Sequence, residues 1–220
     1  MADATSDSSR QLAALAAEYW EVTMRHSPTY ATLLGDHRYD DQIEDLSEDG
    51  DQAQHDALGS LRDRLARVDH GALLGIDAVT ARLLASDLAD RMRSIELSLI
   101  ELRSDQMDGP HVGYLISAPQ MAADDAEQAH MLTDRFRHLG TALDQAIERF
   151  RAGAAKGRAP AQLCIARSLS SIDGYLASPL DDDVFVNLTG PEGWPGEAAW
   201  RDDLRQAVRT SGASRLPAHA

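Results

Sequence analysis

The residues best suited to chemistry lie in one short polar loop, where the sequence reads GDHRYDD from Gly35 to Asp41. Asp36, His37 and Arg38 could contact a substrate there, because carboxylates beside an imidazole favour its charged form and suit it to acid–base work. The same residues also fit a plain turn, in which Asp36 caps backbone amides and Arg38 pairs with an acid elsewhere. The sequence leaves both interpretations open and makes Asp36, His37 and Arg38 the predicted substrate-binding residues.

Two other groups of residues have the right chemistry for a metal ion but the wrong spacing. His130 and His138 lie about two helical turns apart, too far for one ion, and none of the eight histidines belongs to a His-Glu-x-x-His motif. The run from Asp181 to Asp183 cannot turn three consecutive carboxylates toward one ion, and it fits helix capping after Pro179 better. The sequence therefore predicts no catalytic residue, no metal ligand and no cofactor in this chain.

Helical periodicity governs the segments that must position the loop. Apolar residues recur at intervals of three or four, and no stretch alternates with the period of a strand for more than a few residues. The predicted helices run from Ser8 or Ser9 to His26, over 52–68, over 76–102, over 124–150, from Pro160 to Pro179 and over 197–208. Pro28 ends the first helix, and Gly35 is placed to close a short helical turn in a left-handed conformation. The predicted fold class is all-α, an antiparallel bundle of about six to seven helices.

We expect one helical domain over residues 9–209. The polar segment 1–8 is expected to be disordered, and 210–220 to form an irregular tail that is rich in Ser, Gly and Ala. The segment 108–120 interrupts the helical pattern with glycine and proline, which predicts an irregular crossover with about one helical turn.

The charge of the chain argues against two classes of partner. Its 36 acidic residues outnumber 21 basic ones, a formal net charge of −15, so nucleic acid and anionic membranes would repel it. No window is long and apolar enough to cross a bilayer, and the acidic start lacks the features of a secretory signal. Cys164 is the only cysteine, so no intrachain disulfide can form. We expect a soluble, cytoplasmic protein.

Three segments, taken in order, resemble a known bacterial family. They are EYWEVTMRHSPTYATLLGDHRYDD, TDRFRHLGTALDQAIERFRAGAAKGRAPAQLCI and DDDVFVNL. Together they are similar to the family known as domain of unknown function 885, from about Leu12 to Val208. The resemblance implies an all-helical protein usually more than twice as long, similar to zinc metallopeptidases whose His-Glu-x-x-His motif lies in the later half. In such folds the early helices form one wall and the lid of a deep cleft. No zinc ligand or general base of the family can be carried over to a position of this sequence.

The resemblance also bears on the end of the chain. The family pattern implies that the helix over 197–208 leads into further long helices, whereas this sequence reads VRTSGASRLPAHA, as a truncation or frameshift would produce. We therefore expect a truncated N-terminal region of a metallopeptidase-like protein, inactive alone, with zinc implied only for full-length relatives. Its partner would be the missing C-terminal part or a second copy of the chain. A free-standing helical module for protein–protein interaction is the alternative, and an enzyme with unrecognised chemistry around His37 is a third hypothesis.

Overall fold

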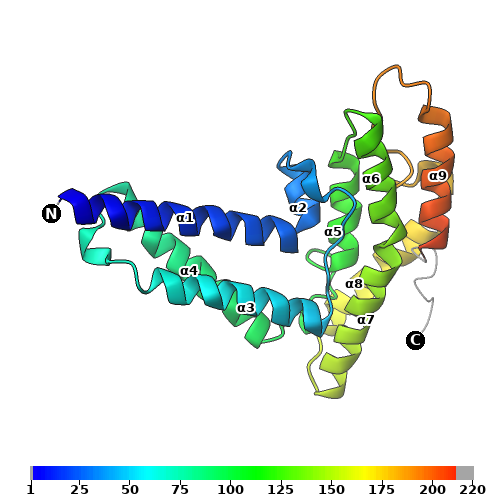
Figure 1. Ribbon diagram of the computed structural model, residues 1–220. Coiled ribbons are helices and arrows are strands. Elements are labelled where there is room, and N and C mark those ends of the chain that lie inside the picture. Colours follow the sequence, from blue (N-terminus) through cyan, green and yellow to red (C-terminus); the bar gives the residue numbers. More distant parts are fainter. Residues whose placement is uncertain (1, 212–220) are drawn as a thin grey trace. The chain divides into compact units, whose positions relative to one another are not determined.

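The computed structural model describes residues 2–211, and the regular structure in this part of the chain is helical (Figure 1). Apart from one isolated backbone bridge between Ala122 and Thr189, none of the described residues pairs as in a β-sheet. The predicted all-α fold is confirmed. The described residues form two compact units, one within 2–26 and 48–99 and the other within 27–47 and 100–211, whereas we expected a single helical domain.

The first unit is a helical bundle of α1 (Ala2–His26), α3 (Glu48–Leu65) and α4 (Ile76–Glu96), with the short 3₁₀ helix η2 (His70–Ala72) between α3 and α4. These three α-helices pack side by side (Figure 1). Their apolar stripes, with residues three or four apart, meet in one core. The buried core residues are Leu12, Leu15, Leu58, Leu61, Leu65, Val68, Leu73, Ala81, Leu84, Leu88 and Met92.

Two boundaries in the first unit differ from the predicted ones. Helix α1 begins at Ala2, so it includes most of the segment 1–8 that we expected to be disordered. The carboxylate of Asp7 accepts hydrogen bonds from side chains three and four positions further on, and such pairs stabilise a helical turn. Helix α4 ends at Glu96, earlier than predicted, because Ser98 adopts a φ of 48° that no α-helix can contain.

The second unit contains the remaining α-helices. They are α2 (Pro28–Leu33), α5 (Pro110–Ser117), α6 (Ala126–Arg137), α7 (Leu139–Ala155), α8 (Gln162–Leu176) and α9 (Glu197–Thr210). The 3₁₀ helices are η1 (His37–Tyr39), η4 (Ala118–Gln120) and η5 (Leu180–Asp182), and η3 (Leu99–Leu102) lies where the chain passes from the first unit to the second. Segment 108–120 is thus more helical than the crossover predicted, since Pro110 suits the first turn of α5.

The core of the second unit forms where α9 packs along α6 (Figure 1). Trp200 of α9 is 1 % exposed, and its indole Nε1 donates hydrogen bonds to the carbonyl oxygen of Ala129 at 2.8 Å and to Oγ1 of Thr133 at 3.0 Å. A buried indole therefore satisfies its only donor on the backbone and side chain of the neighbouring helix. This contact fixes the position of α6, which carries a residue of the candidate site.

The helix predicted over 124–150 is two helices in the structure. Helix α6 ends at Arg137 and α7 begins at Leu139, with His138 at the junction. Gly140, near the start of α7, lets the end of α9 come close, because a Cβ atom built on it would collide with the backbone carbonyl of Ser211. The backbone at the end of α9 occupies the space that any other residue at this position would need.

The predicted tail over 210–220 lies outside the described residues except for Thr210, the last residue of α9, and Ser211. None of the helices in residues 2–211 combines the length and the apolar character that crossing a bilayer would require.

Candidate functional site

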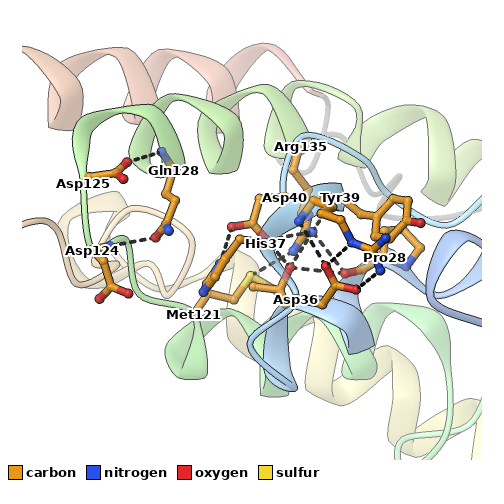
Figure 2. Close-up of polar contacts among 12 residues, drawn as sticks. Pro28, Asp36, His37, Tyr39, Asp40, Met121, Asp124, Asp125, Gln128 and Arg135 are labelled. Carbon is orange, nitrogen blue, oxygen red and sulfur yellow. Dashed lines mark hydrogen bonds and ion pairs between the residues drawn. The ribbon is translucent and has the colours of Figure 1, made fainter. Parts of the chain in front are cut away.

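The loop predicted to bind substrate follows α2, and Gly35 sets its direction. Gly35 adopts a φ of 81°, as predicted, in the left-handed region that glycine enters at little cost. Asp36 then caps the 3₁₀ turn η1, since its side chain accepts a hydrogen bond from the backbone N–H of Arg38 at 3.3 Å. The structure therefore brings Asp36, His37 and Arg38 together on one turn. Figure 2 labels Asp36 and His37 of this turn.

Arg38 forms a two-pronged ion pair with Asp36. Its Nε lies 2.8 Å from Oδ1 of Asp36, and its Nη2 lies 2.6 Å from Oδ2. The hydrogen bonds from Arg38 hold the pKa of the Asp36 carboxyl below its ordinary value, against the opposing effect of burial. The guanidinium of Arg38 also lies 5.3 Å from the centre of the Tyr39 ring, within the range of a cation–π contact. Asp36 both caps the turn and forms an ion pair with Arg38. The acid that pairs with Arg38 is therefore two residues away, not elsewhere in the chain as one interpretation of the sequence had it.

His37 is held by the buried carboxylate of Asp40. Its Nδ1 lies 2.8 Å from Oδ2 of Asp40, whose side chain is 0 % exposed, whereas the His37 side chain is 33 % exposed. Thr32 donates its hydroxyl to the other oxygen of Asp40 at 2.5 Å. Because a carboxylate only accepts hydrogen bonds, Nδ1 of His37 carries the proton, and a neutral ring keeps a lone pair on Nε2. The arrangement prepares Nε2 to accept a proton or a hydrogen bond.

Arg135 of α6 ties this turn to the core. Its Nε donates to the carbonyl of Gln42 at 2.7 Å, and its Nη2 to the carbonyls of Tyr39 at 2.8 Å and Pro28 at 3.2 Å. The same Nη2 lies 2.7 Å from the hydroxyl oxygen of Thr32. Figure 2 shows the guanidinium at the centre of these contacts. One side chain thereby joins both ends of segment 28–42.

The Arg135 guanidinium is a buried charge, with the residue 1 % exposed. Burial lowers its pKa from the ordinary value, and the carboxylates of Asp40, Glu44 and Asp41 oppose that shift. The nearest of these oxygens, Oδ1 of Asp40, lies 3.8 Å from Nη2. A buried arginine is tolerated where carbonyls and a carboxylate satisfy its donors, which is the case here.

The start of α6 fixes where Arg135 lies. Asp125 is the N-cap residue, and its side chain accepts a hydrogen bond from the backbone N–H of Gln128 at 2.9 Å. The side chain of Gln128 accepts in return from the backbone N–H of Asp124 at 2.9 Å (Figure 2). The second contact differs from a capping box only in that Gln128 bonds the residue before the N-cap, and the two contacts together set the first turn of the helix that carries Arg135 two turns later.

A second polar contact anchors the loop beyond η1. Glu44 accepts hydrogen bonds from the backbone N–H of Thr29 at 3.0 Å and from its hydroxyl at 2.9 Å. Tyr114 of α5 is 8 % exposed, and burial, followed by the charge and hydrogen bond of Glu44, raises its pKa well above the ordinary value. The backbone N–H of Leu46 donates to Oε1 of Gln145 on α7 at 3.0 Å. The loop is thus bound to α5, α6 and α7.

The described residues do not fit a zinc ion. Within residues 2–211 no three His, Cys, Asp or Glu side chains gather as a protein zinc site requires, and Asp40 already takes one ring nitrogen of His37. His130 lies edge-on against the Trp194 ring with centroids 5.8 Å apart. Asp183 accepts hydrogen bonds from the hydroxyl of Tyr175 at 2.6 Å and the backbone N–H of Phe185 at 2.8 Å.

Sequence reasoning did not identify the residues that hold the loop from beneath. The sequence analysis did not predict a role for Asp40, Thr32 or Arg135. The position of Arg135 in the sequence nevertheless indicates that its side chain is held by polar partners. Arg135 lies three positions after Leu132, on the apolar face of a predicted helix, where a charged side chain must find partners if it is buried. The partners themselves were not predictable, because they come from a segment about a hundred residues earlier.

A family model described as a bacterial protein of unknown function, DUF885, matches residues 28–218. The match begins at the first residue of α2, later than Leu12, where we expected the resemblance to start, and it includes both the loop and Arg135. It extends to residue 218, so most of the segment 210–220, which we expected to depart from the family pattern, is part of the match. No curated protein matches the chain.

Proposed function

The chain belongs to the DUF885 family of bacterial proteins, and from this premise we propose that it is the N-terminal helical region of a metallopeptidase-like protein, in which the Asp36–His37–Arg38 turn contacts the substrate. The family match supports the first part of the proposal, and the geometry of the turn supports the second. The role assigned to the turn is binding, because neither the whole sequence nor the turn supplies a His-Glu-x-x-His motif. Alone, the chain should bind peptide without cleaving it.

The observation that carries this proposal is the buried Arg135 beneath a partly exposed histidine. Placing a guanidinium in a protein interior costs free energy, and apolar residues of similar volume would often stabilise the fold as well or better. Arg135 instead donates hydrogen bonds to backbone carbonyls next to the turn that carries His37. Such an arrangement is suited to holding one side chain in a fixed orientation, which is what a recognition site requires.

The chemistry of the turn suits a peptide. Nε2 of His37 can accept a hydrogen bond from a peptide N–H, because Asp40 holds the proton on Nδ1. The guanidinium of Arg38, 55 % exposed, can exchange part of its pairing with Asp36 for a carboxylate of the ligand. A peptide offers both groups on one molecule.

The test is peptide binding by the intact chain, followed by fluorescence anisotropy with a fluorescein-labelled digest of casein. His37→Ala should weaken binding about tenfold, the equivalent of one hydrogen bond of roughly 1.4 kcal/mol. His55→Ala is the matched control, since His55 is a partly exposed histidine of α3 in the other unit and should leave binding unchanged. Equal binding by the parent and His37→Ala would refute the role of the turn, and casein hydrolysis by the chain with added zinc would refute the assignment of binding alone.

The alternative function is a helical module for protein–protein interaction, and exposed apolar residues on α4 favour it. Ile76, Val79 and Leu83 are 75 %, 38 % and 66 % exposed, and their spacing puts them on one side of the helix. Capture of a protein partner that depends on these residues, with no effect of His37→Ala, would favour the module over the peptide-binding region.

A further inference from the structure

Helix α8 is apolar in sequence yet lies largely at the surface of its unit. Its one buried residue is Ser168, and Leu163 and Leu169 are 60 % and 56 % exposed. The inner side of the helix uses Ile172 and Tyr175, which line a small cavity together with residues of α5 and α7. The residues on the opposite side of α8 are exposed.

This outer face is a row of small residues. Ala166, Ser170 and Gly174 follow one another at every fourth position, and all three are exposed. Residues four apart lie on the same side of a helix. A Cβ atom built on Gly174 would meet no atom within 4 Å. Small side chains let the backbone of a second helix approach closely, and the exposed Leu163, seven positions before Ser170 on the same side of the helix, supplies apolar area.

The charged residues of α8 indicate which helix could pack against this face. Arg167 and Asp173 are its only charged residues, both are exposed, and they lie at equal distances before and after Ser170. Neither forms an ion pair within residues 2–211. If two copies of α8 pack antiparallel about a two-fold axis at Ser170, each Arg167 comes level with the Asp173 of the other copy. The same operation sets Ala166 against Gly174, so the face is complementary to itself in charge and in size.

The net charge of the whole chain supports the choice of this face. Two copies that each carry a formal charge of −15 repel one another over most of their surfaces. Helix α8 has one positive and one negative side chain and is therefore neutral. Two copies can approach there without the repulsion that the acidic surfaces would cause.

We propose that the chain forms a two-fold symmetric dimer through α8, with the two helices antiparallel and Ser170 on the axis. The dimer does not depend on the peptide-binding role, since α8 contributes none of the residues of the turn. Its occupant is a second copy of this chain, and the self-complementary spacing of Arg167 and Asp173 about Ser170 is the reason.

The first test is the mass of the purified chain in solution, measured by sedimentation equilibrium over a wide range of concentrations. The expected result is an equilibrium between 23.9 kDa and twice that mass. Arg167→Glu places two acids level with each other twice in the dimer and should weaken association about tenfold or more. Adding Asp173→Arg to that variant restores opposite charges and should return the dissociation constant to within about threefold of the parent.

Two serines provide a matched test of the geometry. In a chain with Cys164 replaced by Ala, Ser170→Cys should form a disulfide-linked dimer on mild oxidation, because the two Cα atoms would lie within the range of about 4.4–6.8 Å that disulfides require. Ser171→Cys, one residue away and off the face, should not. Gly174→Gln, which has free space in the monomer, should fold normally and abolish the dimer.

Three results would overturn the proposal. The first is a mass of 23.9 kDa at every concentration, which would leave the face to another protein or to further chain. The second is a dimer that neither the charge changes nor Gly174→Gln affects. The third is equal cross-linking through Ser170→Cys and Ser171→Cys, which would show that the contact does not lie on the predicted axis.

Discussion

Replacing Arg135 with methionine removes the cation that the carbonyls of Pro28, Tyr39 and Gln42 share, and keeps an unbranched side chain in the core. The carboxylate of Asp40 would stay buried without its nearest cation. Breaking a buried ion pair by removing one partner costs about 3–5 kcal/mol. We therefore expect the free energy of unfolding of the second unit to fall by about 3–5 kcal/mol.

The measurement is urea unfolding followed by tryptophan fluorescence. Trp20 belongs to the first unit, whereas Trp194 and Trp200 belong to the second, so a Trp20→Phe background makes the signal specific for the second unit. Arg137→Met is the matched control. Arg137 lies on the same helix, but its side chain is 43 % exposed and pairs with Asp134 and Asp203 at the surface, so its removal should cost at most about 1 kcal/mol.

Two further variants keep the prediction testable if Arg135→Met fails to fold. Arg135→Lys keeps the charge but loses the planar fork, so it should retain some of the contacts and cost less than methionine does. In a cycle with Asp40→Asn, the double variant should be more stable than the sum of the single effects by about 1–3 kcal/mol. If Arg135→Met lowers the free energy of unfolding no more than Arg137→Met does, the idea that Arg135 holds the loop is refuted.

Two further predictions concern the stability of variants with single substitutions. Gly140→Ala should destabilise the fold by about 1–3 kcal/mol, because its Cβ would meet the backbone of Ser211, whereas Gly174→Ala should stabilise it by about 0.5–1 kcal/mol, both measured by urea unfolding. The hydrogen bond from Lys156 lowers the pKa of Glu101 in the folded chain. The ionised Glu101 therefore stabilises the fold above the ordinary carboxyl pKa, and this stabilisation is lost as the pH falls through the lowered pKa. Stability should therefore decline with acid in that range, and Glu101→Gln should flatten the decline; an unchanged slope would contradict the assignment.

Local signals predicted the features of the fold that local chemistry determines. Pro28 ended α1 at His26, Gly35 took its left-handed conformation, and Asp125 began α6, each decided within a few residues along the chain. The two units were not foreseen, because an apolar stripe shows that a helix is buried but not against which other helix. Nor was the break at His138 foreseen, because the apolar pattern continues across it from Phe136 to Leu139.

The candidate site divides in the same way. The cap that Asp36 forms lies within its own turn, so the sequence could indicate it, whereas the expected partner of Arg38 was an acid elsewhere and the structure pairs Arg38 with Asp36. The hydrogen bonds of Arg135 join residues 93 to 107 positions apart, and nothing in the loop itself specifies them. The amino-acid sequence of the loop alone therefore does not determine the arrangement of the site. In a chain that has this loop but an apolar residue at the position of Arg135, the His37–Asp40 contact should loosen, because the carbonyls of Tyr39 and Gln42 lose the donors that hold the turn in place. In Arg135→Met, NMR should therefore find weaker selection of the Nδ1-protonated form of His37, and a parent-like tautomer would show that Thr32 and Asp40 suffice without the arginine.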